Sequence, residues 1–340
     1  MRQVWITKAG RPEVLRVKEA PDPEPKAGDV RIRVEASGVN FADILARLGI
    51  YPDLPGLPAV VGYEVAGRVD AVGAGVDQGW IGRDVFAATR FGGYSDVICA
   101  PEDQVFIRPA DMSAEEGAAL PVNYLTAWQL VVVMGALKPG ETMLVHSAGG
   151  GVGVAATQIA KHIGARVIGV ASQWKHAELE KLGADHLVDM RREDLQKRVT
   201  DITGGRGVEL VLDPNAGPSF RKSFQMLAPT GRLGMFGVSS FVNGKERDLL
   251  NLLRALIGTP LFQFMPMTLI NANKGAFGVN LGRMWGETDR MRGWGMELLA
   301  LWEKGAIRPR IDRVFSFDDA AAAHDYLQDR RNLGKVLLKP

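Results

Sequence analysis

The stretch Met143–Gly164, MLVHSAGGGVGVAATQIAKHIG, decides the fold of this chain. Its first five residues, Met143–Ser147, are typical of a short buried strand, and an apolar-periodic helix follows the run of glycines. Glycines let a backbone approach phosphate groups, and a helix N-terminus offers free N–H groups and a partial positive charge. The fingerprint reads Ala148-x-Gly150-x-x-Gly153, with alanine at the first position. The order strand, glycine turn, helix therefore predicts a site for a dinucleotide pyrophosphate.

The residues after the next expected strand indicate which dinucleotide is bound. An acidic residue at this place holds the adenosine ribose hydroxyls and selects NAD. The segment Ala171–His176, ASQWKH, contains no Asp or Glu, whereas Ser172 and Lys175 can bind a 2′-phosphate by hydrogen bond and charge. The sequence thus favours NADP(H), with NADPH as the reduced form. The alternative is that Lys175 is an exposed residue in the first turn of the following helix.

The chain on either side of this stretch has two different patterns. Residues 1–110 hold short β-rich runs, among them the strictly alternating Val30–Glu35 and the glycine-interrupted Val60–Val72, with one short helix at 41–47. This pattern predicts an all-β unit. A capping box, Ser113–Glu116, then opens a small helix, and a longer helix is expected over 124–133.

From Glu141 onward, strands and helices alternate, which requires a parallel sheet with helices on both faces. The expected strands are 143–147, 166–171, 186–188, 208–213 and 231–237, and the expected helices are 152–163, 175–182, 191–202 and 218–227. Later helices are expected near 248–257, 287–304 and 318–329. Strands at 314–317 and 335–338 are expected to rejoin the β unit.

Composition excludes several classes of function. A chain of 340 residues that is 46% hydrophobic is long enough for two domains. A net charge of +2 with both signs interspersed gives no electrostatic reason for a nucleic-acid or anionic-membrane partner. Cys99 is the single cysteine, so no intrachain disulfide forms. Ala255–Asn273 is uncharged, but Pro260, Gln263 and Pro266 interrupt it, so no membrane span is expected. The N-terminus lacks an apolar signal region, and a cytoplasmic location is expected.

Spaced motifs along almost the whole chain resemble one family. They are Gly38–Asp43, Gly62–Gly67, Leu125–Ala127, His146–Gly153, Leu182–Asp185 and Gly334–Leu338. On these motifs the chain resembles the medium-chain dehydrogenase/reductase superfamily, in its zinc-independent quinone oxidoreductase branch of zeta-crystallin and synaptic-vesicle-protein-like members. The resemblance implies an α/β fold: a GroES-like β-barrel catalytic domain from residues 1–122 and 268–340, and a Rossmann doubly wound parallel sheet from residues 123–267. It also implies a homodimer.

The positions of the zinc ligands in this superfamily carry other residues here. Asn40 stands near a cysteine position, Tyr63-Glu64 replaces a His-Glu pair, and Val122 stands near a further cysteine position. A tetrahedral zinc site needs three or four N, S or O donors. Without the zinc ligands no metal site is expected, and the resemblance implies an acceptor that is already electrophilic rather than an ordinary alcohol.

The resemblance also implies the residues of the site. Asn40, Tyr51 and Thr126 would line the nicotinamide from the β side and serve catalysis. The implied cofactor contacts are Ala148, Gly150, Gly151, Val152, Gly153, Ser172, Lys175, Asn215, Phe236, Gly237, Val238, Phe277, Val279, Asn332 and Lys335.

Several of these residue types have alternative interpretations. Asn40 can instead cap the helix that follows it, and Tyr51 can be a hydrophobic lid residue. Tyr63 is interpreted as packing, Glu64 as structural and His146 as a core or turn histidine. The Met- and Phe-rich run 261–270 fits either a substrate pocket or a core or dimer-edge segment. No Ser/His/Asp arrangement, nucleophilic cysteine or paired carboxylate is evident.

The function expected from these observations is hydride transfer from NADPH to a small-molecule acceptor. The acceptor would be a quinone, or a C=C conjugated to the carbonyl of an enone or an enoyl thioester such as an enoyl-CoA. Two alternatives stay open at this point. One is an NADPH-binding scaffold or sensor without turnover, and the other is a zinc-type alcohol dehydrogenase.

Overall fold

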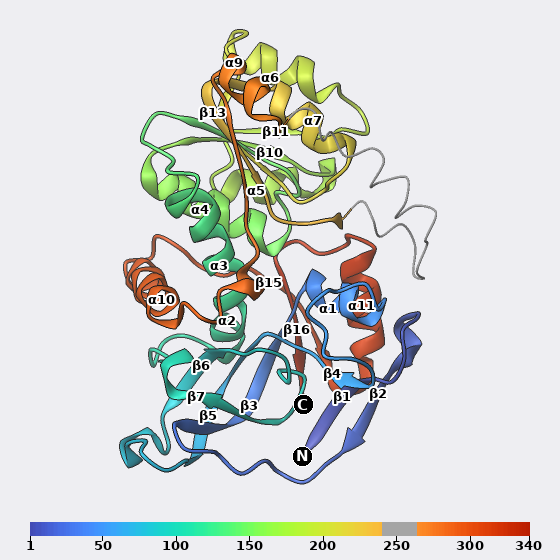
Figure 1. Ribbon diagram of the computed structural model, residues 1–340, viewed down its shortest axis with the longest axis vertical. Coiled ribbons are helices and arrows are strands. Elements are labelled where there is room, and N and C mark those ends of the chain that lie inside the picture. Colours follow the sequence, from blue (N-terminus) through green and yellow to red (C-terminus); the bar gives the residue numbers. More distant parts are fainter. Residues whose placement is uncertain (240–263) are drawn as a thin grey trace.

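The computed structural model describes residues 1–239 and 264–340. Figure 1 shows two units: a parallel sheet flanked by helices in the upper half and a larger, mostly antiparallel β unit in the lower half, which holds both chain ends. The expected helix near 248–257 and the first part of the 261–270 run lie outside the described residues. In the described part of the chain, no helix is both long and apolar enough to cross a membrane.

The upper unit is built on a six-stranded sheet whose strands are all parallel, in the order β11-β10-β9-β12-β13-β14. Its strands are β9 (Thr142–Val145), β10 (Arg166–Val170), β11 (His186–Val188), β12 (Val208–Asp213), β13 (Leu227–Met235) and β14 (Gly275–Gly278). The residues of β9 and β12 are buried throughout, as is typical of strands covered on both faces. The doubly wound parallel sheet expected from the sequence is confirmed.

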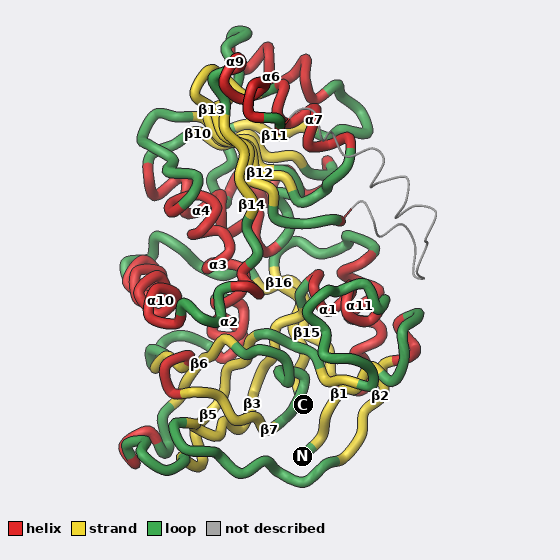
Figure 2. The backbone as a smooth tube through the Cα atoms, viewed as in Figure 1, coloured by secondary structure: helices red, strands yellow, loops and turns green. Residues whose placement is uncertain are grey.

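Helices cover both faces of this sheet (Figure 2). On one face, α4 (Gly151–Ile163) and α5 (His176–Lys181) pack with alternate residues of β9 in one apolar cluster. On the other face, α6 (Leu195–Thr203), α7 (Pro218–Gln225) and α9 (Pro266–Ala272) pack in a second cluster. Because successive side chains of a strand point to opposite faces, Met143 and Val145 join the first cluster and Leu144 joins the second.

Three details of this unit differ from the sequence prediction. The helix expected over 191–202 begins only at Leu195, because the Asp194 side chain accepts the N–H of Lys197 at 2.9 Å and caps the helix there. The strand expected over 231–237 already begins at Leu227. The sixth strand, β14, was not expected, since its sequence GAFG holds no β-branched residue. It pairs with β13, which places residues 275–278 in the six-stranded parallel sheet, whereas the resemblance implied the β unit for them.

The lower unit contains a sheet in the order β15-β16-β3-β5-β6-β8, with β7 paired to β3, and a small sheet β2-β1-β4. The strands are β1 (Arg2–Ile6), β2 (Leu15–Glu19), β3 (Asp29–Val39), β4 (Ala59–Val60), β5 (Glu64–Val72), β6 (Asp84–Ala88), β7 (Val97–Pro101), β8 (Val105–Ile107), β15 (Ile311–Ser316) and β16 (Lys335–Lys339). Over 30–35, β3 alternates buried residues with half-buried or exposed ones, as expected. The return of the two last strands is confirmed, because β16 pairs antiparallel with β3.

The remaining helices lie between and beside the two sheets. They are α1 (Phe41–Arg47), α2 (Ala114–Ala119), α3 (Pro121–Trp128), α10 (Thr288–Glu303) and α11 (Ala320–Gln328). The capping box at Ser113 is confirmed, since its hydroxyl accepts the N–H of Glu116 at 3.1 Å. The longer helix ends at Trp128 and continues as one turn of π-helix over Gln129–Val133. One apolar cluster runs from the lower sheet through α2 and α3 to the upper sheet, so the two units share a core.

Candidate active site

The glycine turn joins β9 to α4 with its glycines in distinct roles. A Cβ on Gly153 would lie 2.4 Å from the carbonyl oxygen of Ser147, so the helix can pack on the strand only with glycine here. A Cβ on Gly151 would lie 2.2 Å from the Asn123 side chain, which places α3 against the same turn. Gly150 is the N-cap, and a Cβ there would meet nothing closer than 3.3 Å. The outer side of the turn is therefore open at Gly150.

This turn fits a bound pyrophosphate. α4 has 13 residues and no side chain caps its N-terminus, so the first N–H groups of the helix have no intrahelical acceptor. Such groups, together with the helix dipole, bind phosphate. Ala148 is buried beneath the turn, while Gly151 and Val152 open the helix. The five residues expected to hold the pyrophosphate thus form one continuous turn at the carboxyl edge of the sheet.

The C-terminal segment before β16 lies directly against this turn. The N–H of Gly334 donates to the carbonyl of Gly149 at 2.9 Å, and Gly150 and Gly334 form a parallel bridge. The side chain of Asn332 is buried and donates to the Gly334 carbonyl at 2.8 Å. Two segments that are far apart in the sequence therefore form one wall of the site.

Lys175 connects the same two segments. It ends a 3₁₀ turn, Gln173–Lys175, and is 7% exposed, so it is not the exposed helix residue of the alternative interpretation. Its ammonium donates to the carbonyl of Arg330 at 3.1 Å and to that of Asn332. An ammonium has three protons, so one donor is left for a phosphate oxygen. Burial, aided by Arg330 and opposed by Asp312, lowers the pKa of Lys175 to about 8.

Arg330 is a cation of this site that the sequence did not reveal. Its charge acts on Lys175, and its guanidinium lies 3.5 Å from the carbonyl oxygen of Ser239. Ser172 precedes the turn that carries Lys175. Arg330 and Lys175 are 155 residues apart, so only the fold brings them together. The one signal in the sequence is that Arg330 stands two residues before Asn332.

The strand ends opposite the glycine turn gather the second group of expected contacts. Val279 donates its N–H to the Met235 carbonyl at 2.8 Å, which aligns the segments after β13 and β14. The N–H of Ser239 donates to the Pro214 carbonyl at 2.9 Å, and its hydroxyl donates to Asn215 at 3.1 Å. The structure thus brings together the expected contacts at these strand ends, which are Asn215, Phe236, Gly237, Val238, Phe277 and Val279.

A buried network holds this loop, and it contains the Ser, His and Asp side chains that the sequence had not connected. Asp213 accepts the hydroxyls of Ser219 and Ser223, each at 2.7 Å, and Ser223 contacts Nε2 of His146 at 3.0 Å. Ser223 is fully buried and donates to the aspartate, so it is not an accessible nucleophile. Burial lowers the pKa of His146, which favours a neutral ring. The network is therefore structural, and His146 is the core histidine that was expected.

The side of the site that the resemblance assigns to catalysis is built on Asn40, Glu64 and Lys335. The Lys335 ammonium donates to Oδ1 of Asn40 at 2.7 Å and to Oε1 of Glu64. Asn40 Nδ2 donates to the same glutamate oxygen at 2.9 Å, and the Val122 N–H donates to Oε2 at 2.7 Å. All three side chains are at least nine-tenths buried. This cluster therefore holds the Asn40 side chain in place. Asn40 and Glu64 stand at or near positions where zinc-dependent members of the superfamily carry metal ligands. Among residues 1–239 and 264–340, no three His, Cys, Asp or Glu side chains gather as metal ligands.

A second buried network lies next to this cluster. Asp43 accepts the N–H of Asn40 at 2.8 Å, the N–H of Gly62 at 3.1 Å and the hydroxyl of Tyr94 at 3.1 Å. Tyr94 in turn contacts Nε2 of His324 at 3.1 Å. Burial raises the pKa of Asp43 to about 7, against the lowering effect of these donors. The network fixes the backbone on both sides of the Asn40 cluster.

Tyr51 and Thr126 approach the site from two other segments. Tyr51 packs edge-on against Tyr63, with ring centroids 6.0 Å apart, and a Cβ on Gly282 would lie 2.8 Å from its hydroxyl. Burial raises the pKa of Tyr51. Thr126 is buried in α3, one turn after the Asn123 that touches the glycine turn. Tyr51 thus lies with Tyr63 rather than in the hydrogen-bonded cluster of Asn40.

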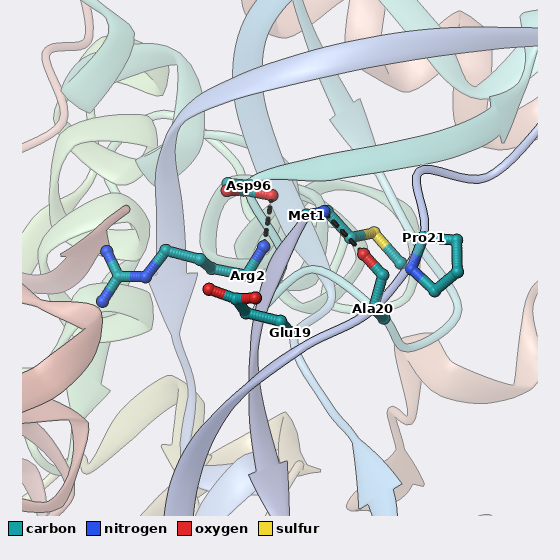
Figure 3. Close-up of a pocket in the computed structure, with 6 residues that line it drawn as sticks. All are labelled: Met1, Arg2, Glu19, Ala20, Pro21 and Asp96. Carbon is teal, nitrogen blue, oxygen red and sulfur yellow. Dashed lines mark hydrogen bonds between the residues drawn. The ribbon is translucent and has the colours of Figure 1, made fainter.

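A surface pocket at the chain start is separate from these residues. Figure 3 shows its lining by Met1, Arg2, Glu19, Ala20, Pro21 and Asp96. Its polar groups already bind one another: the Met1 ammonium donates to the Ala20 carbonyl at 2.6 Å, and the Arg2 N–H donates to Asp96 at 2.9 Å. None of the expected site residues lines it, and we assign it no role.

Comparison with known proteins agrees with this architecture. Residues 26–110 match the family described as "Alcohol dehydrogenase GroES-like domain", and residues 151–272 match that described as "Zinc-binding dehydrogenase". The human synaptic vesicle membrane protein VAT-1 homolog is 38% identical over 327 residues, which cover 96% of this chain and 82% of the relative.

Two solved structures show the same fold over the whole chain. Escherichia coli quinone oxidoreductase, complexed with NADPH, is similar with a TM-score of 0.87 at 31% identity and covers 100% of both chains. The CurK enoyl reductase is similar with a TM-score of 0.84 at 28% identity and covers 99% of this chain and 98% of that one. This chain belongs to the medium-chain dehydrogenase/reductase superfamily. Within it, the similarities place the chain in the zinc-independent quinone oxidoreductase and VAT-1-like branch.

Proposed function

We propose that the protein is an NADPH-dependent oxidoreductase that reduces an activated acceptor by hydride transfer. One observation supports this most directly: the C-terminal segment carries Asn332 against the glycine turn and Lys335 into the Asn40 cluster. A cofactor that spans these two places would have its phosphates at the turn and its reacting end at the cluster. The NADPH complex of the similar Escherichia coli enzyme supports the choice of cofactor.

The residues that would hold NADPH fall into three groups. The turn residues Ala148–Gly153 would bind the pyrophosphate through their N–H groups. Ser172, Lys175 and Arg330 would bind the 2′-phosphate, because one donor of Lys175 is left and the second cation lies beside it. The segments around Asn215, 236–238 and 277–279 would line the nicotinamide end. This end is where Asn40, Tyr51 and Thr126 would face the acceptor.

NADPH, when bound, supplies a hydride with its two electrons and is left as NADP⁺. The acceptor gains this hydride and then a proton from water, and between the two events its oxygen carries negative charge. Asn40 and Tyr51 would orient this oxygen, and Lys335 would hold the Asn40 amide in place through its hydrogen bond to Oδ1. Such a site suits acceptors that are already electrophilic, either quinones or the conjugated C=C of enones and enoyl thioesters. The enoyl reductase among the similar structures supports keeping the second class in the proposal.

The test is NADPH oxidation by the purified chain with 1,4-naphthoquinone, 2-cyclohexen-1-one and crotonyl-CoA. Turnover with at least one of them supports the proposal. NADPH binding without turnover on any acceptor would instead favour a scaffold or sensor. Metal found by elemental analysis, with alcohol oxidation, would favour a zinc-type alcohol dehydrogenase. A homodimer stays a prediction from the resemblance, and a cytoplasmic location stays a prediction from the N-terminal sequence.

The cofactor assignment has its own variant. Lys175→Ala should weaken NADPH binding about 10- to 100-fold, as expected when a charge-assisted contact is lost, and leave NADH binding nearly unchanged. Lys181→Ala is the matched control, because Lys181 is 72% exposed and pairs only with Glu178 among the described ion pairs. Equal losses for both cofactors would show that Lys175 does not recognise the 2′-phosphate.

A further inference from the structure

Tyr63 has a buried hydroxyl that the fold leaves unused. The residue directly precedes β5 and is 6% exposed. Its hydroxyl has no hydrogen-bond partner of ordinary geometry among the residues that the structure describes, and the neighbouring Tyr51 hydroxyl is the one group that interacts with it. Buried polar groups are almost always paired, because leaving one unpaired costs the free energy of its desolvation. A phenylalanine would fill the same space without this cost, so packing alone does not explain a tyrosine here.

The neighbours of Tyr63 tie it to the catalytic side of the site. The N–H of Gly62 donates to Asp43 at 3.1 Å, and Glu64 accepts the Asn40 amide at 2.9 Å. The carbonyl of Tyr63 itself accepts the N–H of Thr89 at 2.8 Å. The backbone of Tyr63 is thus fixed on both sides relative to the helix that begins after Asn40. A residue held this firmly keeps its side chain in a defined place.

Two more aromatic rings surround the Tyr63 ring. Tyr51 lies edge-on to it, with centroids 6.0 Å apart and planes at 66°, and Phe91 lies 5.2 Å away at 50°. Phe91 has a φ of 80°, a left-handed conformation that is uncommon for a bulky residue and costs free energy. The fold tolerates this conformation where it holds a ring against Tyr63. The three rings form an apolar wall that carries two phenolic hydroxyls, and these lie near enough for each to act on the pKa of the other.

We propose that Tyr63, together with Tyr51, donates a hydrogen bond to the oxygen of the acceptor. This inference rests on the proposed function and adds a residue to it, one that the sequence had suggested to be mere packing. Among the described residues, only the Tyr51 hydroxyl lies near enough to interact with the hydroxyl of Tyr63, and no bond of ordinary geometry holds it there, so it is able to turn to the acceptor oxygen. Two donors at one oxygen form the arrangement that stabilises a developing negative charge.

The chemistry of the two phenols fits this role. Burial raises the pKa of Tyr51 and that of Tyr63, so both remain O–H donors at neutral pH. The acceptor takes the hydride, with its two electrons, at a carbon atom or at one quinone oxygen. The carbonyl oxygen at the other end of the conjugated system then carries a negative charge until it takes a proton from water. Neither tyrosine changes its protonation state in this sequence. They stabilise the negative charge that develops on the oxygen, and this raises the rate of the hydride step.

The test is Tyr63→Phe, which removes one oxygen atom and keeps the ring. With 1,4-naphthoquinone we expect kcat to fall about 100-fold, the lower range for loss of one oxyanion donor, with little change in KM. NADPH affinity should stay the same, and the melting temperature should be equal to or above that of the wild type, because an unpaired buried hydroxyl is removed. A purely structural role predicts a lower melting temperature with unchanged turnover per folded molecule, and that result would overturn the proposal.

Tyr124→Phe is the matched control. Tyr124 is similarly buried, but its hydroxyl donates to Gln158 at 2.8 Å. This variant should melt at a lower temperature and keep its turnover per folded molecule. A wild-type chain that turns over none of the acceptors would refute the proposed function, and this inference with it. Wild-type turnover that survives Tyr63→Phe with less than about a 5-fold loss, well below the cost of a lost donor, refutes the inference alone.

Discussion

The buried pair of Lys335 and Glu64 allows a sharp test of what holds the Asn40 cluster together. Lys335 is 3% exposed and Glu64 fully buried, and Lys335→Met removes the cation while roughly keeping the volume of the side chain. Removal of one partner leaves the carboxylate buried without its counter-ion, which typically costs about 3–5 kcal/mol. Glu64 keeps two N–H donors, from Val122 and Asn40, so we expect a cost near the lower limit, about 3 kcal/mol.

A second substitution should restore most of this loss. When Glu64→Gln is combined with Lys335→Met, no charge remains, and the amide oxygen of the introduced glutamine can still accept the Val122 N–H. The amide nitrogen of that glutamine can donate to Asn40 Oδ1 once the Asn40 amide rotates, since Lys335 no longer occupies that acceptor. Because replacement of a buried ion pair by neutral groups is often close to neutral, the double variant should lie within about 1 kcal/mol of the wild type.

The assay is urea unfolding followed by tryptophan fluorescence, with the four proteins of the double-mutant cycle measured side by side. Lys339→Met is the control on the same strand, because its pair with Glu115 is half exposed and should be worth about 0–1 kcal/mol. The reasoning is refuted if Lys335→Met costs no more than the control. It is also refuted if Glu64→Gln adds to the loss of Lys335→Met instead of offsetting it.

Four further predictions rest on the same structure. Gly153→Ala should destabilise the protein by about 3 kcal/mol or more in urea unfolding, since its Cβ would lie 2.4 Å from the Ser147 oxygen. Gly150→Ala, whose nearest neighbour is at 3.3 Å, should keep stability within about 1 kcal/mol but weaken NADPH binding in a fluorescence titration. Burial raises the pKa of Asp43 from 3.8 to about 7, so the folded state binds a proton that the unfolded state has lost, and stability should fall as pH rises through this window. Unfolding midpoints of Asp43→Asn across this pH range should lack that fall, and equal slopes would contradict the assignment. The pKa of Lys175 is about 8, so NADPH affinity should decline above pH 8 as the ammonium loses its proton, and Lys175→Met should abolish this decline in titrations at several pH values.

Local patterns in the sequence were sufficient for most of the secondary structure. The strand, glycine turn and helix of 143–164 were recognised because the periodicity of apolar residues and the glycine spacing are properties of neighbouring residues. The strand β14 was missed for the same reason, since GAFG has no strand-forming pattern and is recruited by pairing with β13. The start of α6 was misplaced because one side-chain hydrogen bond of Asp194 decides it.

The site was only partly visible in the sequence. The pyrophosphate turn is one continuous segment, so its residues could be named together. Other parts of the site depend on contacts between segments that are far apart in the sequence, and no pattern of neighbouring residues predicts such contacts. These parts are the Asp213 network, the place of Arg330 beside Lys175 and the surroundings of the Tyr63 hydroxyl.

By itself, then, the sequence determined a glycine turn between a buried strand and a helix, the absence of an acidic residue after the second strand, and the loss of the zinc ligands. Only the tertiary structure decided that Lys335 lies between Asn40 and Glu64, which are 295 and 271 residues away along the chain. The physical reason is the register of β16 on β3, which brings the last strand beside the start of α1. There the charges of Lys335 and Glu64 neutralise each other, and both side chains bind the buried Asn40.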